Sequence, residues 1–312
     1  MNCLQPISAG TSRSAVGLPR RRAAAFSLIE IMIVMALLSV MVLGLMAMFN
    51  QTQRAFRLGM AQTDVLESGR VASDLLGREL QEIVPTSSNT NFNFSPSFYA
   101  ELMNLRNTSV QPLNGTGPVQ ARANMLEDIF FVTHENQTWS GIGYFVRSNI
   151  AFPTGAGFNF VGALYRFETN DSAARFQQNP GGLVDGFAAA VDGRARLVVS
   201  KIVDGVVHFR VRAFDTNGIL ISPLWVPTNG LITVREQFAA LPGENTLYVF
   251  KSNAVPASLE LELGILEPQV FERMKSLPTP QAQSNFLASQ AAHVHLFRQR
   301  VSIRNVDPSG YQ

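Results

Sequence analysis

The sequence contains little cysteine and little charge. Cys3 is the single cysteine among 312 residues, which excludes an internal disulfide framework and any zinc or iron–sulfur site built from several cysteines. Charged residues form 15% of the chain, against roughly 25% in ordinary soluble domains. The length allows one or two domains with a full hydrophobic core, so the shortage of charge indicates that part of the chain avoids water.

The motifs of common enzyme classes are absent as well. The sequence has no Walker loop, no Gly-x-Ser-x-Gly and no His-Glu-x-x-His, since His134-Glu135 lacks the second histidine. Only three lysines and no stripe of basic and aromatic residues argue against a strong nucleic-acid surface. We therefore expect no enzymatic activity, no cofactor and no nucleic-acid partner for this chain.

Two patterns could hold a metal ion, but both have simpler explanations. His293 and His295 would share one face of a strand, yet no third ligand lies near them in sequence, so half-buried polar packing is favoured. Asp and Asn residues near 170–171 and 215–217 lack the spaced carboxylates of a calcium loop, so turn chemistry is the better interpretation. The sequence predicts no metal site.

An uncharged apolar run follows a basic N-terminus. Residues 1–25 contain four arginines and no acid, and we interpret them as unstructured. The run Ile31–Phe49 has no charged residue and is long enough to cross a bilayer core of about 30 Å as a helix. A buried core helix does not fit such a long run, and the apolar region of a cleaved secretory signal has about 7–15 residues. The sequence favours a retained membrane anchor.

The arginines predict how that anchor is oriented. Arg20, Arg21 and Arg22 directly precede it, and positive residues stay on the cytoplasmic side. We therefore expect a cytoplasmic N-terminus and an exported C-terminal remainder.

Glu30 is the one charged residue between Phe26 and Gln53. A carboxylate at that depth costs a few kcal/mol on insertion scales. Two interpretations follow from the physics alone. The side chain could reach back to the lipid headgroups, or it could be a buried carboxylate that needs a cationic partner.

The residues around Glu30 carry a resemblance. The run Arg22–Val34 reads Arg-Ala-Ala-Ala-Phe-Ser-Leu-Ile-Glu-Ile-Met-Ile-Val, which closely resembles the processing site of type IV prepilins and type II secretion pseudopilins. The resemblance implies that prepilin peptidase cuts between Ala25 and Phe26, that Phe26 is N-methylated, and that Glu30 pairs with the α-amino group of Phe26 in this or a neighbouring subunit. Two departures are Ala25, where the family usually has Gly, and Ser27, where Thr is common.

A long helix is predicted after the cleavage site. No proline occurs between Pro19 and Pro85, so a helix could run over residues 26–84. Its second half is amphipathic, with a stripe of small and apolar residues that should pack on a globular head: Leu58, Ala61, Val65, Gly69, Ala72, Leu76, Leu80 and Ile83. Four glycines, Gly44, Gly59, Gly69 and Gly77, are close packing points or, near Gly44 and Gly59, points of flexibility.

The remaining chain predicts a β-rich head, so the fold class is α+β: a pilin-like fold with a long N-terminal helix packed on an antiparallel sheet with long loops. We expect 1–25 to be a leader, 26–49 transmembrane, 50–84 the amphipathic continuation and 85–312 the head.

Alternation predicts strands in the head at 128–133, 141–147, 163–169, 206–214, 246–250, 258–264 and 294–304. Residues 86–120 are expected to form a surface loop with a short helix at 97–106. Insertions are expected at 148–160, 170–195 and 215–245, and helices at 267–275 and 281–292.

The head carries a second, weaker resemblance, to the W-type minor pilins and J-type minor pseudopilins. Four segments match their patterns in order, although alternating core positions explain a good part of the match. They are Gly143–Val146 followed by Gly162–Arg166, then Val206–Val211 with Asp215–Gly218, then Pro256–Leu263, and last Phe297–Asn305.

Together these patterns predict a minor pilin or pseudopilin of the bacterial inner membrane, with its head in the periplasm. The expected partners are prepilin peptidase, other minor and major pilins or pseudopilins, the inner-membrane assembly platform and membrane lipid. Alternatives are a ligand-binding or adhesive pilus-tip subunit and a signal-anchored periplasmic enzyme. The filament that the subunit would serve could act in secretion, in motility or in DNA uptake. Removal of the leader would take Cys3 and four arginines away, leaving 21 basic residues against 23 acidic ones.

Overall fold

The computed structural model describes residues 27–86, 96–102, 110–112, 121–123, 126–147, 161–179, 181–191, 199–222, 224–226, 230–236 and 246–311. The chain divides between Phe56 and Arg57 into two compact units. The first helix, α1 (Leu28–Gln81), runs across this division without a break. Its bounds confirm the predicted long helix to within three residues at each end.

The part of α1 beyond Arg57 is amphipathic, as predicted. Val65, Ala72, Leu76 and Leu80 are buried at the spacing of one helix face, and Ile83, just after the helix, is buried in the same core. After the helix ends, the N–H of Val84 donates to the carbonyl of Val132 at 3.1 Å, so the chain passes directly into the head.

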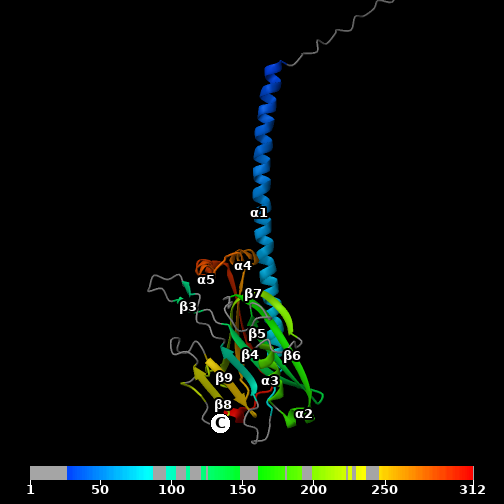
Figure 1. Cartoon of the computed structure of the whole chain (residues 1–312), viewed down its shortest axis with the longest axis vertical. Helices are drawn as coiled ribbons and strands as arrows, with labels where there is room; N and C mark the ends of the chain where they lie inside the picture. Colours follow the sequence, from blue (N-terminus) through cyan, green and yellow to red (C-terminus); the bar gives the residue numbers. More distant parts are fainter. Residues whose placement is uncertain are drawn as a thin grey trace, which may run out of the picture. The chain divides into compact units, whose positions relative to one another are not determined.

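The head is built on a nine-stranded sheet in the order β11-β10-β7-β6-β5-β4-β1-β9-β8 (Figure 1). All pairings between its strands are antiparallel. The strands are β1 (Pro96–Leu102), β4 (Glu127–Glu135), β5 (Thr138–Arg147), β6 (Gly162–Ser172), β7 (Val199–Phe214), β8 (Ile232–Glu236), β9 (Thr246–Lys251), β10 (Ser258–Leu266) and β11 (Val294–Ser302). A separate pair joins β2 (Val110–Pro112) to β3 (Ala121–Ala123). The long apolar helix and the antiparallel head confirm the predicted α+β, pilin-like class.

Alternate side chains of the sheet enter two different cores. Phe131 and Tyr144 belong to the core that contains the buried stripe of α1. Their neighbours Phe130 and Phe145 belong to a second, aromatic core with residues of α2 (Ala173–Gln178) and α3 (Gly182–Val191). Both faces of β4–β6 are therefore covered.

Two further helices pack at the end of β10 and β11. These are α4 (Pro268–Lys275) and α5 (Pro280–Ser289), which confirm the two predicted C-terminal helices. Val270, Met274 and Leu287 are buried with Val207 and Leu266 of the sheet. The short 3₁₀ helices η1 (Ala291–His293) and η2 (Pro308–Tyr311) follow α5 and β11.

Several predicted loops contain regular structure. The helix expected at 97–106 is wrong, because Pro96–Leu102 forms β1, which pairs with β4 on one side and β9 on the other. The insertion expected at 170–195 contains α2 and α3, and the one at 215–245 contains β8. Local composition predicted loops there, but pairing and burial within the head override it.

Candidate functional site

The start of α1 brings Ser27 and Glu30 together. The carbonyl of Ser27 accepts the N–H groups of Glu30 at 3.1 Å and Ile31 at 3.3 Å, and Ser27 Oγ accepts the same Glu30 N–H at 3.3 Å. Ser27 therefore acts as a helix cap, a role that serine and threonine share. Glu30 lies exposed in the first turn, where the positive end of the helix dipole favours an anion.

The other predicted processing residues, Ala25, Phe26, Arg20, Arg21 and Arg22, lie outside the described residues. The structure therefore describes Glu30 and its cap, and leaves the cleavage site itself as a prediction.

The first half of α1 exposes an unbroken apolar surface. Every large apolar side chain from Leu28 to Phe49 is more than half exposed. A soluble protein rarely exposes apolar area on this scale to water, so this surface needs lipid or partner helices around it. The helix is also long and apolar enough to cross a membrane.

A comparison with known families identifies the same segment. Residues 20–46 match the family model described as "Prokaryotic N-terminal methylation motif". The match supports the type IV pilin and pseudopilin family. No curated protein and no solved structure matches the chain significantly. The prepilin-type N-terminus and the apolar helix that follows it fit membrane anchoring.

In the head, Tyr144 and Arg166 both contact the last turns of α1. The hydroxyl of Tyr144 donates to Glu79 Oε2 at 2.5 Å, and Arg166 Nε donates to Glu79 Oε1 at 2.8 Å. Burial, and then the charge of Glu79, raise the pKa of Tyr144 above its ordinary value. Both residues belong to the second resemblance, but nothing in the sequence pointed to Glu79 as their common partner.

Another pair from that resemblance lies at the end of the same helix. Arg304 donates its backbone N–H to the carbonyl of Gln81 at 3.3 Å and its Nη2 to Gln81 Oε1 at 3.1 Å. The side-chain amide of Asn305 donates to the carbonyl of Ile83 at 3.1 Å. The C-terminal carbonyls of a helix lack partners within it. Arg304 supplies a partner for the last helical residue, and Asn305 binds the chain two residues beyond the helix.

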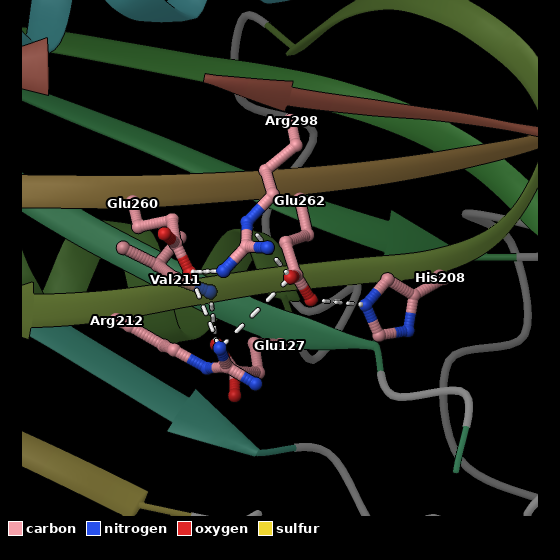
Figure 2. Close-up of polar contacts among 7 residues, drawn as sticks. All are labelled: Glu127, His208, Val211, Arg212, Glu260, Glu262 and Arg298. Atoms are coloured by element: carbon pink, nitrogen blue, oxygen red, sulfur yellow. Dashed lines mark hydrogen bonds and ion pairs between the residues drawn. The ribbon is translucent and has the colours of Figure 1, made fainter. Parts of the chain in front are cut away.

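The face of β7 and β10 opposite α1 carries a charged network (Figure 2). Glu260 accepts from Arg298 at 2.7 Å and from Arg212 at 3.2 Å, while Glu262 lies 3.2 Å from His208 Nε2. Leu259, Leu261 and Leu263 point the other way, into the α1 core, so the alternation that predicted a strand at 258–264 is confirmed. The network joins neighbouring strands across the face.

Glu127 is a buried carboxyl that sequence analysis missed. Its Oε2 accepts the backbone N–H of Val211 at 2.6 Å (Figure 2). The pairing of β7 with β6 covers Val199–Val206, and beyond it the start of β4 meets β7 through Glu127 and a bridge from Leu126 to Phe209. Burial raises the pKa of Glu127 to about 8, although the Val211 hydrogen bond and Arg210 lower it.

The histidine pair contacts a carboxylate. His293 Nδ1 and His295 Nε2 lie 3.0 and 3.2 Å from the two oxygens of Glu267. Burial acts to raise the pKa of Glu267, but the hydrogen bonds from His295 and His293 outweigh it and lower the pKa. Within the described part of the chain, no cluster of three or more His, Cys, Asp or Glu residues is placed to hold a metal ion.

The predicted turn chemistry holds at one of its two places. Asp215 Oδ1 accepts the N–H groups of Asn217 at 2.9 Å and Ile219 at 2.7 Å, and Gly218 takes the positive φ that the turn needs. The prediction is wrong at 170–171, because these residues pair with Ser140 and Trp139 inside β6.

Proposed function

We propose that this pilin-type subunit is a minor pilin or pseudopilin, of the W or J type, that acts where a type IV pilus or type II secretion pseudopilus starts or ends. The observation that carries the proposal is the prepilin-type motif over residues 20–46. It opens a helix whose apolar side chains are exposed from Leu28 as far as Phe49. A structural subunit of a filament needs that motif and that helix, and needs no catalytic group.

Processing would take place at the cytoplasmic edge of the inner membrane. Arg20, Arg21 and Arg22 would hold the leader in the cytoplasm, and prepilin peptidase would cut between Ala25 and Phe26. The apolar helix would remain in the inner membrane with the head in the periplasm, and Phe26 would be N-methylated.

Glu30 would then serve assembly. Cleavage creates a cationic amino group on Phe26, four residues before Glu30, at a place where an unpaired carboxylate is costly. An ion pair between Glu30 and the Phe26 amino group of this or a neighbouring subunit would remove that cost. Such pairs specify register between packed helices better than they add stability.

The size of the head supports a minor rather than a repeating subunit. In the described part of the head, α2 to α5 pack against the nine-stranded sheet, and bulky additions obstruct close helical stacking. The partners would be other minor and major pilins or pseudopilins, the inner-membrane assembly platform and membrane lipid.

The experiment that tests processing is the intact mass of a variant at the cut. Ala25→Trp is expected to leave uncut precursor in cells that contain prepilin peptidase, because the site before the cut accepts small residues. Ala23→Trp is the matched control and should be cut normally. Normal cleavage of the Ala25→Trp protein would contradict the proposed site.

One observation favours the adhesive-tip alternative. Leu224 is 96% exposed and Trp225 is 53% exposed, in a tight turn closed by two hydrogen bonds between Ser222 and Trp225. If the head binds a surface through this turn, cells with Trp225→Ala should assemble filaments and lose attachment. Attachment at the wild-type level would rule out this role for the turn.

A further inference from the structure

The apolar stripe of α1 nearly repeats itself along the helix. Ala72, Leu76 and Leu80 lie four residues apart and enter the same core. Hydrophobic contact has no direction, so a shift of four residues, about 6 Å along the axis, would place Leu76 where Leu80 now lies. The stripe explains why α1 packs on the head, but it distinguishes poorly between neighbouring registers.

The hydrogen bonds at the helix end favour the native register as well. Arg304 and Asn305 bind the carbonyls of Gln81 and Ile83, which lie at and just beyond the last helical residue, where carbonyls lack partners within the helix. A shift of four residues could bring Gly77 to the place of Gln81, and the carbonyl of Gly77 already accepts within the helix. The side-chain contact of Arg304 with Gln81 is exposed and adds little.

Two glycines also discriminate sterically between registers, to different degrees. A Cβ at Gly69 would lie 2.1 Å from the Phe297 ring, and one at Gly77 would lie 2.9 Å from the Gln299 amide. Phe297 and Gln299 are half-buried on β11, an edge strand of the sheet. The Gln299 amide is the far end of a flexible side chain, so Gly77 resists a shift only weakly. A Cβ at Gly69 would displace a whole aromatic ring that packs against the core, so Gly69 resists a shift more strongly.

Glu79 discriminates between registers through buried polar partners. Tyr144 is 0% exposed, and the side chain of Arg166 is 19% exposed. A shift of four residues in either direction would bring Leu75 or Ile83 to the place of Glu79. The buried Tyr144 hydroxyl would then be left without its partner, and Arg166 would lose its carboxylate on α1, and both losses are unfavourable.

We propose that Glu79 is the positioning residue that sets the register of α1 in the head. The contact joins residues 65 and 87 positions apart in sequence, so it forms only when helix and sheet meet correctly. Its consequence for assembly rests on the proposed function: the register decides which faces of α1 the head covers and which stay free for neighbouring subunits.

A pair of spin labels on the full-length chain in detergent tests this proposal. Cys3→Ser removes the only native cysteine, and cysteines at Glu67 and Ala174 carry the labels on exposed positions of α1 and α2. The labels lie on α1 and on a helix that packs against the sheet, so a shift of α1 relative to the sheet changes the distance between them. With native Glu79 we expect one distance, and with Glu79→Leu a second population displaced by about 6 Å.

Two variants separate register from stability. Glu82→Leu makes the same substitution at an exposed position of the same helix end and should keep the single distance. The triple variant Glu79→Leu, Tyr144→Phe, Arg166→Met removes every buried polar group of the contact, so it should fold at least as well as Glu79→Leu and still show two distances. A single native distance in the triple variant would overturn the proposal, whether or not Glu79→Leu alone folds.

The outcome is independent of processing. Two distances together with an uncut wild-type chain would keep the register proposal and remove its role in assembly. A single native distance in the triple variant, together with a processed chain, would overturn the register proposal and leave the proposed function intact.

Discussion

The buried carboxyl of Glu127 leads to a prediction with a definite sign. Burial raises its pKa from 4.5 to about 8, so at pH 7 the folded head keeps a proton that the unfolded chain has released. The free energy of unfolding therefore falls as the pH rises from about 4.5 to about 8, by about 1.4 kcal/mol per pH unit. At pH 7 the cost is about 3 kcal/mol.

Glu127→Gln removes this cost without removing the acceptor, because the amide oxygen can still accept the N–H of Val211. We expect the variant to be more stable than wild type at pH 7, by up to about 3 kcal/mol, and the difference to vanish near pH 4.5. Urea unfolding of the full chain in detergent, followed by the fluorescence of Trp139 and Trp225 at several pH values, measures both quantities.

The matched control is Glu135→Gln, at an exposed position of the same strand, which should follow the wild-type pH dependence. Parallel pH profiles for Glu127→Gln and wild type would mean that Glu127 is ionised in the folded head. That result would refute the reasoning from burial.

Three further predictions concern other charged groups. Glu30→Val should leave insertion and cleavage intact but reduce incorporation into filaments, measured on sheared filament fractions; incorporation at the wild-type level would contradict the proposed pairing. Asp128→Asn should cost about 3–5 kcal/mol, because it breaks the buried, two-bond contact with Arg147, whereas Asp204→Asn in the exposed pair with Lys201 should cost at most about 1 kcal/mol in the same urea assay. The lowered pKa of Glu267 predicts stability that is present above pH 4.5 and is lost as the pH falls through the lowered value. Hydrogen exchange in α4 and α5 should therefore quicken at low pH in wild type and be less dependent on pH in Glu267→Gln.

Much of the architecture could be predicted from local pattern. The absence of proline between Pro19 and Pro85 and the apolar stripe after Arg57 predicted α1, and alternation predicted β4, β5, β10 and β11. β1 was missed because Ser, Asn and Pro surround it, although in the folded head it lies between two strands. The glycine-rich composition of 170–195 similarly hid α3, whose Leu183 and Phe187 are buried.

The residues of the candidate site likewise divide into those that the sequence could predict and those that it could not. Ala25, Phe26 and Glu30 form a contiguous motif, so sequence alone could propose their roles. Glu79 and Glu127 could not be identified, because their partners are distant in sequence and come together only through the sheet. Tyr144 and Arg166 stood out as pattern residues, but the pattern did not show that they share one carboxylate.

The most direct test of the central claim is the mass of the mature protein. Purified from the membranes of cells with active prepilin peptidase, the protein should begin at Phe26 and be heavier than the unmodified mature chain by one CH2, because a methyl group replaces a hydrogen of the amino group. The same protein from cells without the peptidase should keep residues 1–25. A membrane protein that retains its leader when the peptidase is active, or that begins at another residue, would contradict the account.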